Sequence, residues 1–265
     1  MRIMSQKLLL FLSILPSIIL GYIVYKEDKV EKEPGSLLIK LLLGGVLSAI
    51  MTIIISAILE SILPFLAAEN KTTIESLIEI LLEVALVEEY CKWIVLKKVT
   101  WTNKEFNYLY DAIVYAVFVS LGFATIENIF YVLDGGLETA ILRAILSVPG
   151  HVFYGVFMGY YYGISKLGEI NNRNDIETKN MYLSIAIPTS LHFIFDFCLT
   201  NPTLISLAFY IIFIVMLYIN AFKKIIQLSK IKRSIIPEQK ILYCPHCGTK
   251  INSKYCSNCG EQVEK

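Results

Sequence analysis

Seven long apolar runs are the feature that most constrains the fold of this chain. Each run approaches or exceeds the length of about 20 residues that a helix needs to cross a bilayer. In chain order the runs are Leu8–Val24, Leu37–Leu59, Ile74–Leu96, Asp111–Leu133, Thr139–Ser165, Met181–Leu199 and Thr203–Ala221. Lipid offers the backbone no hydrogen-bond partner, so runs of this kind fold as helices. The sequence therefore predicts an all-α, polytopic membrane helix bundle of about seven spans, integral to the cell membrane.

Basic residues between the runs indicate the orientation of the bundle. Three lie on the face that holds the N-terminus, namely Arg2, Lys7 and Lys71. Fourteen lie on the other face: Lys26, Lys29, Lys32, Lys97, Lys98, Lys104, Lys166, Arg173, Lys179, Lys223, Lys224, Lys230, Lys232 and Arg233. The positive-inside rule predicts that the second face, with the C-terminus, is cytoplasmic. These basic residues are divided among loops and are not gathered on one face, so nucleic acid is not an expected partner. The apolar runs make the lipid bilayer an expected partner.

The C-terminal part carries a separate cysteine-rich module. We divide the chain into a helical bundle at 1–225, a basic linker at 226–242 and this module at 243–261. Two Cys-x-x-Cys knuckles, each followed by glycine, supply four thiolates: Cys244, Cys247, Cys256 and Cys259. Four thiolates suit tetrahedral Zn²⁺, which predicts a structural zinc ribbon. Two disulfides are the alternative, which a cytoplasmic location disfavours. Because four ligands close the site, the zinc is expected to be structural and not catalytic. The module is then expected to bind a cytoplasmic protein partner or to regulate the activity of the bundle.

Ionisable side chains inside the apolar runs are the candidate functional residues, because such groups are costly in lipid and mark functional positions. The catalytic candidates are Glu88, Glu89, Glu127, His151 and His192, and the supporting candidates are Lys92, Asp111, Asn128 and Asp196. Glu88 and Lys92 are four residues apart, as are His192 and Asp196, so each pair shares one helix face. The nearby aromatic residues Tyr154, Phe157, Tyr160 and Tyr161 are interpreted as packing and interface residues.

Depth in the membrane can be counted along each run. At about 1.5 Å per residue, Glu88, His151 and His192 fall in one layer, whereas Glu127 falls nearer the outer surface. A tilt, a kink or a misplaced boundary of the span would remove this difference. Carboxylates and imidazoles that converge in an apolar bundle suit a metal that activates water. They equally suit a glutamate base with histidine stabilising the oxyanion. Both arrangements hydrolyse an amide bond. The alternative for each residue is an ion pair or hydrogen bond that only holds helices together.

Three motifs in order carry a resemblance to a known family. They are Glu-Glu-x-x-Lys at 88–92, Phe-x-x-x-Glu at 123–127 and His-x-x-x-Asp at 192–196, supported by the stretches at 110–115, 120–128 and 151–155. Over residues 74–199 the chain resembles the PrsW family of intramembrane proteases, relatives of the CAAX prenyl protease-like membrane proteases. The resemblance matches Glu88 and Glu89 to the paired glutamates, Glu127 to the third glutamate and His192 to the histidine.

The resemblance implies a glutamate- and histidine-dependent endopeptidase that cleaves membrane-embedded or single-span proteins. The family is usually grouped with metalloproteases, and cleavage of an anti-sigma factor is the implied role of its named member. The chain has no His-Glu-x-x-His helix, so a catalytic zinc and a metal-free Glu/His site both stay open.

Two other functions compete with proteolysis. One is an ion- or proton-coupled transporter, which the lack of an inverted repeat disfavours. The other is a non-catalytic membrane scaffold that presents the zinc ribbon, which the intact set of carboxylates and histidines disfavours.

Overall fold

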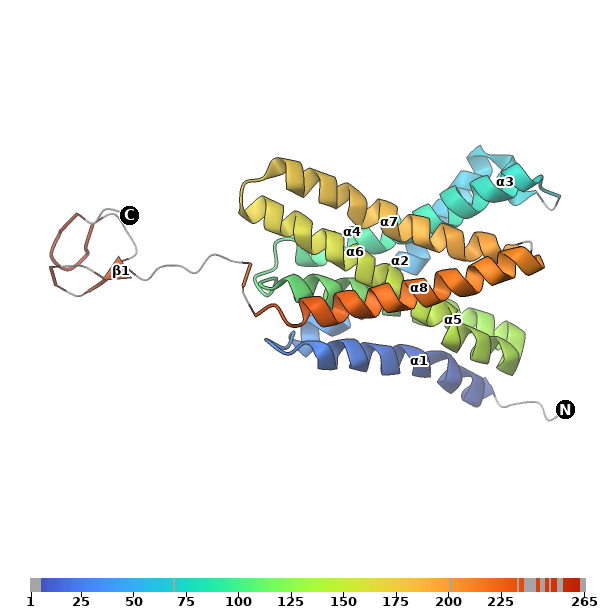
Figure 1. Ribbon diagram of the computed structural model, residues 1–265, viewed down its shortest axis with the longest axis horizontal. Coiled ribbons are helices and arrows are strands. Elements are labelled where there is room, and N and C mark those ends of the chain that lie inside the picture. The colour runs from blue at the N-terminus through green and yellow to red at the C-terminus, as the bar shows by residue number, and fades with distance from the viewer. Residues whose placement is uncertain are drawn as a thin grey trace. The chain divides into compact units, whose positions relative to one another are not determined.

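The computed structural model describes residues 6–68, 70–200, 202–232, 234–235, 242–243, 246–247, 249–251 and 255–262. The chain divides into two compact units, Met1–Ile235 and Ile236–Lys265. The first is a helix bundle and the second is the small cysteine-rich module (Figure 1). Three residues used in the sequence analysis lie outside the described residues: Cys244 of the predicted ribbon, and Arg2 and Arg233 of the predicted charge asymmetry.

The bundle consists of long helices joined by short connections (Figure 1). In order they are α1 (Gln6–Glu27), α2 (Gly35–Ile62), the 3-10 turn η1 (Pro64–Ala67), α3 (Thr73–Ile78), the π-helix η2 (Glu79–Leu86), α4 (Val87–Thr100), α5 (Leu109–Ile145), α6 (Ser147–Ile170), α7 (Asn174–Thr200) and α8 (Leu204–Leu228). Among the described residues, five helical stretches are long and apolar enough to cross a membrane, and one of them, Leu109–Ile170, contains both α5 and α6. The remaining predicted span corresponds to α3, η2 and α4. The predicted all-α membrane bundle is confirmed.

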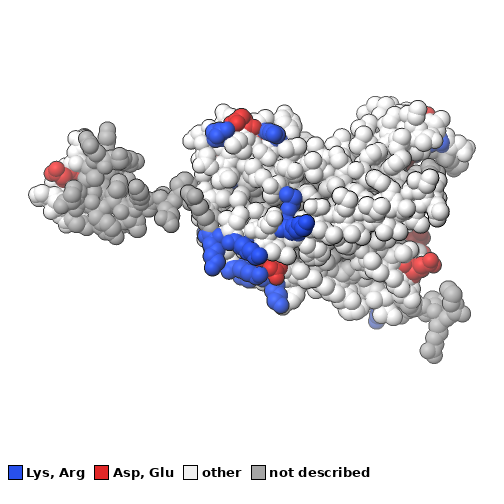
Figure 2. Space-filling view, in the orientation of Figure 1, with Lys and Arg blue, Asp and Glu red and all other residues white. Residues whose placement is uncertain are grey.

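Side-chain polarity is reversed relative to a water-soluble protein. Leu204 and Ile205 on α8 are 87% and 83% exposed, whereas Glu89 and Lys92 on α4 are completely buried. Figure 2 shows a broad face of the bundle with few charged residues. Soluble proteins rarely expose large contiguous apolar patches. The reversal therefore fits an apolar surface in lipid around a polar interior.

Helices α2 and α5 cross at two glycines. A Cβ added at Gly45 would lie 2.1 Å from the carbonyl oxygen of Val119, and one added at Gly122 would lie 2.0 Å from the carbonyl oxygen of Leu42. Small residues permit this close approach of backbones, which packing between membrane helices favours. The crossing fixes α5, which carries Glu127 one and a half turns further along.

The chain reverses at Gly136, within the element labelled α5. Gly136 has φ 74° and ψ −152°, a conformation that favours glycine because it has no Cβ. The turn separates a long arm, Leu109–Gly135, from a short arm, Leu137–Ile145. After Leu146 (φ −114°, ψ −62°), α6 begins at Ser147. This turn lies between the predicted fourth and fifth spans.

The C-terminal unit contains a two-stranded antiparallel pair. Strand β1 (Leu242–Tyr243) pairs with β2 (Lys250–Ile251), in the register Leu242 to Ile251. The two strands lie on either side of the first Cys-x-x-Cys knuckle in the sequence, which is the local structure expected of a ribbon.

Candidate active site

Helix α4 supplies three ionisable side chains from one face. Lys92 Nζ donates to Glu89 Oε1 at 2.8 Å and to Glu88 Oε2 at 3.3 Å, in the i,i+3 and i,i+4 spacings of a helix. The side chains of Lys92 and Glu89 are 0% exposed and that of Glu88 is 11% exposed. The cation of Lys92 also lies 3.9 Å from the centre of the Phe123 ring on α5. A buried ammonium thus compensates two neighbouring carboxylates.

Helix α7 places His192 against the α4 carboxylates. Its Nδ1 lies 3.1 Å from Glu89 Oε1 and 3.9 Å from Glu88 Oε2, and its Nε2 lies 3.2 Å from Asp196 Oδ2. The ring of Tyr154 stacks on the imidazole at 4.9 Å, and its buried hydroxyl has no hydrogen-bond partner among the described residues. Tyr154, interpreted from the sequence as packing, therefore also orients a candidate catalytic ring.

His151 on α6 joins the two halves of the cluster. Lys92 Nζ donates to its Nδ1 at 3.2 Å, and its Nε2 lies 2.9 Å from Glu127 Oε2 on α5. An ammonium can only donate, so Nδ1 of His151 is the acceptor and Nε2 carries the proton that it donates to Glu127. The rings of His151 and His192 lie 5.3 Å apart. The structure thus brings all five catalytic candidates together.

The predicted depth mismatch of Glu127 is wrong, because its carboxylate contacts His151 directly. The residue count assumed a straight, unbroken helix from Glu138 to His151. The chain turns at Gly136, and the backbone angles of Leu146 (φ −114°, ψ −62°) depart from those of a straight helix, so such a count does not give the position of His151 relative to Glu127.

Arg143, which the sequence analysis did not single out, also belongs to this cluster. Its Nη2 lies 2.8 Å from Glu127 Oε2, and its Nε donates to Asn128 Oδ1 at 2.9 Å. The Asn128 amide in turn donates to the carbonyl of Ser13 on α1 at 2.7 Å. The signal was present in the sequence, since Arg143 is a charged residue inside a predicted span.

Asp111 lies apart from this cluster, in a second acidic group at the start of α5. Its Oδ2 accepts from the backbone N–H groups of Asn107 and Tyr108 at 2.9 and 2.7 Å, and so caps the helix. Oxygens of Asp111, Asp28 and Glu33 lie within 4.8 Å of one another, and the Tyr115 hydroxyl donates to Glu33 at 2.8 Å.

Burial raises the pKa values of Asp28 and Glu33, the two acids of this second group that lie in the loop between α1 and α2. It raises the pKa of Asp28 to about 6 and, together with the Asp111 carboxylate, the pKa of Glu33 to about 9. The position of Asp111 supports a structural role at the start of α5. It does not support contact with the candidate catalytic groups.

A cavity of about 630 Å³ opens beside the catalytic candidates. Its lining includes Glu88, Glu127, His151 and His192, with Arg143, Tyr154 and Asp196. Glu89 does not line it. The volume falls in the range of ligand pockets, and the mixture of apolar walls with a few convergent polar groups is typical of an active site.

Four buried side chains could share one metal ion. Glu88, Glu89, His151 and His192 each offer a donor atom, and these atoms all lie within 4.8 Å of one another. Oε2 of Glu89 is buried and has no hydrogen-bond partner among the described residues. Carboxylate and imidazole are the donors of catalytic zinc sites, so the set fits such an ion. Lys92 Nζ contacts three of these four residues and is the competing cation.

Three cysteines of the C-terminal unit lie close together. Sulfur atoms of Cys247, Cys256 and Cys259 lie within 4.8 Å of one another, and those of Cys247 and Cys256 are 3.5 Å apart. Tetrahedral zinc with bonds of about 2.3 Å separates its sulfurs by about 3.8 Å, so the spacing fits a zinc site. The hydroxyl and backbone N–H of Thr249 lower the pKa of Cys247 to about 5, which favours the thiolate that a metal binds.

Comparison with known proteins gives one consistent family. The profile described as "PrsW family intramembrane metalloprotease" matches residues 33–221. The chain is 36% identical over 70% of its length to Protease PrsW of Oceanobacillus iheyensis, of which it covers 80%. It is 37% identical over 69% of its length to Protease PrsW of Geobacillus kaustophilus, of which it covers 76%. It is 32% identical over 89% of its length to Protease PrsW of Clostridioides difficile, of which it covers 94%. No solved structure matches the chain.

Proposed function

Because this chain belongs to the PrsW family of intramembrane metalloproteases, we propose that it is an endopeptidase that hydrolyses peptide bonds of membrane-embedded or single-span proteins. One observation carries the proposal. Two glutamates and two histidines from three helices have donor atoms within 4.8 Å of one another, beside a cavity in an apolar bundle. Charged groups are costly in such a place unless they are used.

Glu88 is the general base in this proposal. It lines the cavity and is partly exposed to it, whereas Glu89 is fully enclosed by Lys92 and His192. Glu88 takes a proton from water as the water oxygen attacks the carbonyl carbon. It then gives that proton to the amide nitrogen as the carbon–nitrogen bond breaks.

His151 and His192 stabilise the negative charge that develops on the carbonyl oxygen. Both line the cavity and carry ring nitrogens that hydrogen-bond to protein carboxylates. A substrate oxygen replaces one of these partners in the transition state. Preorganised donors of this kind contribute about 2.7–4 kcal/mol each. Before the substrate binds, Glu89, Glu127 and Asp196 hold Lys92 and the two rings in place.

The donor set Glu88, Glu89, His151 and His192 would hold a catalytic zinc ion. When bound, zinc polarises the carbonyl and lowers the pKa of bound water. Lys92 must then withdraw from the donors that it now contacts. Sensitivity to a chelator, reversed by added zinc, supports this version, and full activity in chelator supports the metal-free version.

The C-terminal module is proposed to be a structural zinc ribbon. The clustered Cys247, Cys256 and Cys259 would be three of its ligands, and the sequence motif supplies Cys244 as the fourth. The role of the module would be to bind a cytoplasmic protein or to regulate. The charge asymmetry supports a cytoplasmic C-terminus. A thiol reagent that cannot cross membranes should leave these cysteines unlabelled in intact cells after zinc is removed, and labelling before lysis would contradict this orientation.

Proteolysis is tested with purified protein and a panel of single-span substrates. Loss of a general base usually costs about 10²- to 10⁴-fold, so Glu88→Gln should slow cleavage by about that factor. His192→Ala should slow it at least as much. If Glu88→Gln, Glu127→Gln and His192→Ala all cleave at the wild-type rate, the proposal is wrong.

A further inference from the structure

Arg143 is a charged residue of the candidate active site that has no assigned role. It lies on the short arm of α5, and all three of its polar or aromatic contacts lie on the long arm. The guanidinium reaches Glu127 at 2.8 Å, Asn128 at 2.9 Å and the ring of Tyr131 at 4.2 Å. Its side chain is 14% exposed. These contacts bridge the turn at Gly136.

The contacts require an arginine. A planar guanidinium presents several N–H groups in fixed directions and stacks on an aromatic face, which a lysine ammonium cannot reproduce. The acceptor on Asn128 is itself oriented, because its amide nitrogen donates to the Ser13 carbonyl at 2.7 Å. A chain of contacts therefore runs from α1 to Glu127: two hydrogen bonds join Ser13, Asn128 and Arg143, and an ion pair joins Arg143 to Glu127.

The end of that chain is a candidate catalytic ring. The same oxygen, Oε2 of Glu127, faces Arg143 at 2.8 Å and Nε2 of His151 at 2.9 Å. We infer that Arg143 is a positioning residue, which holds the Glu127 carboxylate in the rotamer that orients His151 toward the cavity. The inference rests on the proposed function of the cavity as a protease site.

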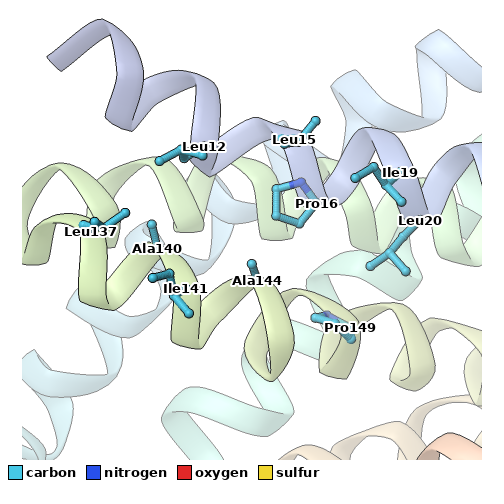
Figure 3. Close-up of a pocket in the computed structure, with 10 residues that line it drawn as sticks. All are labelled: Leu12, Leu15, Pro16, Ile19, Leu20, Leu137, Ala140, Ile141, Ala144 and Pro149. Atoms are coloured by element: carbon cyan, nitrogen blue, oxygen red, sulfur yellow. The ribbon is translucent and has the colours of Figure 1, made fainter. Parts of the chain in front are cut away.

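The short arm does not depend on Arg143 to stay folded. Figure 3 shows Ala140, Ile141 and Ala144 of this arm across an apolar pocket from Leu12 and Pro16 of α1. Buried Ala140 also packs with Leu9 and Val132. Loss of the guanidinium therefore removes one polar tether of Glu127 and leaves the apolar packing of the arm, so a folded variant is expected.

The experiment measures kcat and KM for one single-span substrate, with the folded state checked by thermal unfolding. Arg143→Met should lower kcat about 10- to 100-fold, because misplacing a reacting group by about 1 Å costs up to 10²-fold. KM should change less than about twofold, since binding contacts common to ground and transition states remain. Arg143→Lys should recover part of the loss. Arg173→Met is the matched control, because Arg173 is exposed and forms an ion pair with Asp175, outside the candidate site.

A double variant separates positioning from a direct effect. Arg143 acts through Glu127, so Arg143→Met combined with Glu127→Gln should be no slower than Glu127→Gln alone. Multiplicative losses, or Arg143→Met at the rate of Arg173→Met, would overturn the inference. If Arg143→Met fails to fold, Arg143→Lys carries the test, and wild-type kcat in that variant overturns it. Wild-type cleavage by all three of Glu88→Gln, Glu127→Gln and His192→Ala would instead overturn the proposed function itself.

Discussion

Replacing Lys92 tests how the cluster is held together. Its ammonium is completely buried and contacts Glu89 at 2.8 Å, Glu88 at 3.3 Å and His151 at 3.2 Å. Lys92→Met keeps most of the side-chain volume but removes the only lysine in contact with these carboxylates among the described residues. Breaking a buried ion pair by removing one partner costs about 3–5 kcal/mol, because the other charge is left uncompensated.

This loss of stability can be measured as a fall in the melting temperature, Tm. For a domain of this size each kcal/mol shifts Tm by about 2–4 °C, so Lys92→Met should lower Tm by about 6–20 °C. The assay is thermal unfolding of the purified protein in detergent. Lys98→Met is the matched control on the same helix, since Lys98 is exposed and surface charges contribute about 0–1 kcal/mol.

Removing the partner as well should restore stability. In the double variant Lys92→Met with Glu89→Gln, no uncompensated charge remains at position 89, so Tm should rise above that of Lys92→Met alone. A Tm for Lys92→Met within about 2 °C of that for Lys98→Met would refute the reasoning, given about 2–4 °C per kcal/mol. So would a double variant less stable than Lys92→Met.

Three further predictions concern regions outside this cluster. Burial raises the pKa of Glu33 from 4.5 to about 9. Above about pH 4.5 the folded chain therefore keeps a proton on Glu33 that the unfolded chain loses. Because the folded state binds more protons, its stability falls as pH rises from about 5 to about 9. Glu33→Gln should flatten the loss of Tm over that range, and an unchanged slope would contradict this. Cys247→Ser should lower the zinc content by one ion per chain and leave the Tm of the bundle unchanged. A zinc content equal to that of the wild type would exclude the ribbon. Gly122→Ala would bring a Cβ within 2.0 Å of the Leu42 carbonyl, so it should lower Tm by more than the same change at exposed Gly35, where nothing lies within 4 Å.

Hydropathy alone predicted the bundle, because a lipid-exposed backbone has few ways to satisfy its hydrogen bonds. The convergence of Glu88, Glu89, His151 and His192 was also predicted, since each is an ionisable residue in an apolar run. The side-chain contacts of each of these residues could not be predicted in the same way. Which residues Glu127 contacts depends on the turn at Gly136, and a linear count does not contain that turn.

Two residues illustrate what a motif does not reveal. Asp111 and His151 lie in comparable motifs, yet Asp111 caps α5 in a separate acidic group while His151 lies at the centre of the candidate site. Arg143 belongs to no motif, and only the reversal of the chain brings it back to Glu127. Side-chain position in three dimensions, which the sequence spacing does not encode, separates these roles.

The position of the bond that is cut tests the central claim most directly. Purified protein and a single-span substrate are reconstituted in vesicles, and the termini of the products are identified by mass spectrometry. The account predicts new termini within or next to the membrane-spanning segment of the substrate, absent with Glu88→Gln. Cuts confined to water-exposed loops, or the same termini formed at an equal rate by Glu88→Gln, would contradict it.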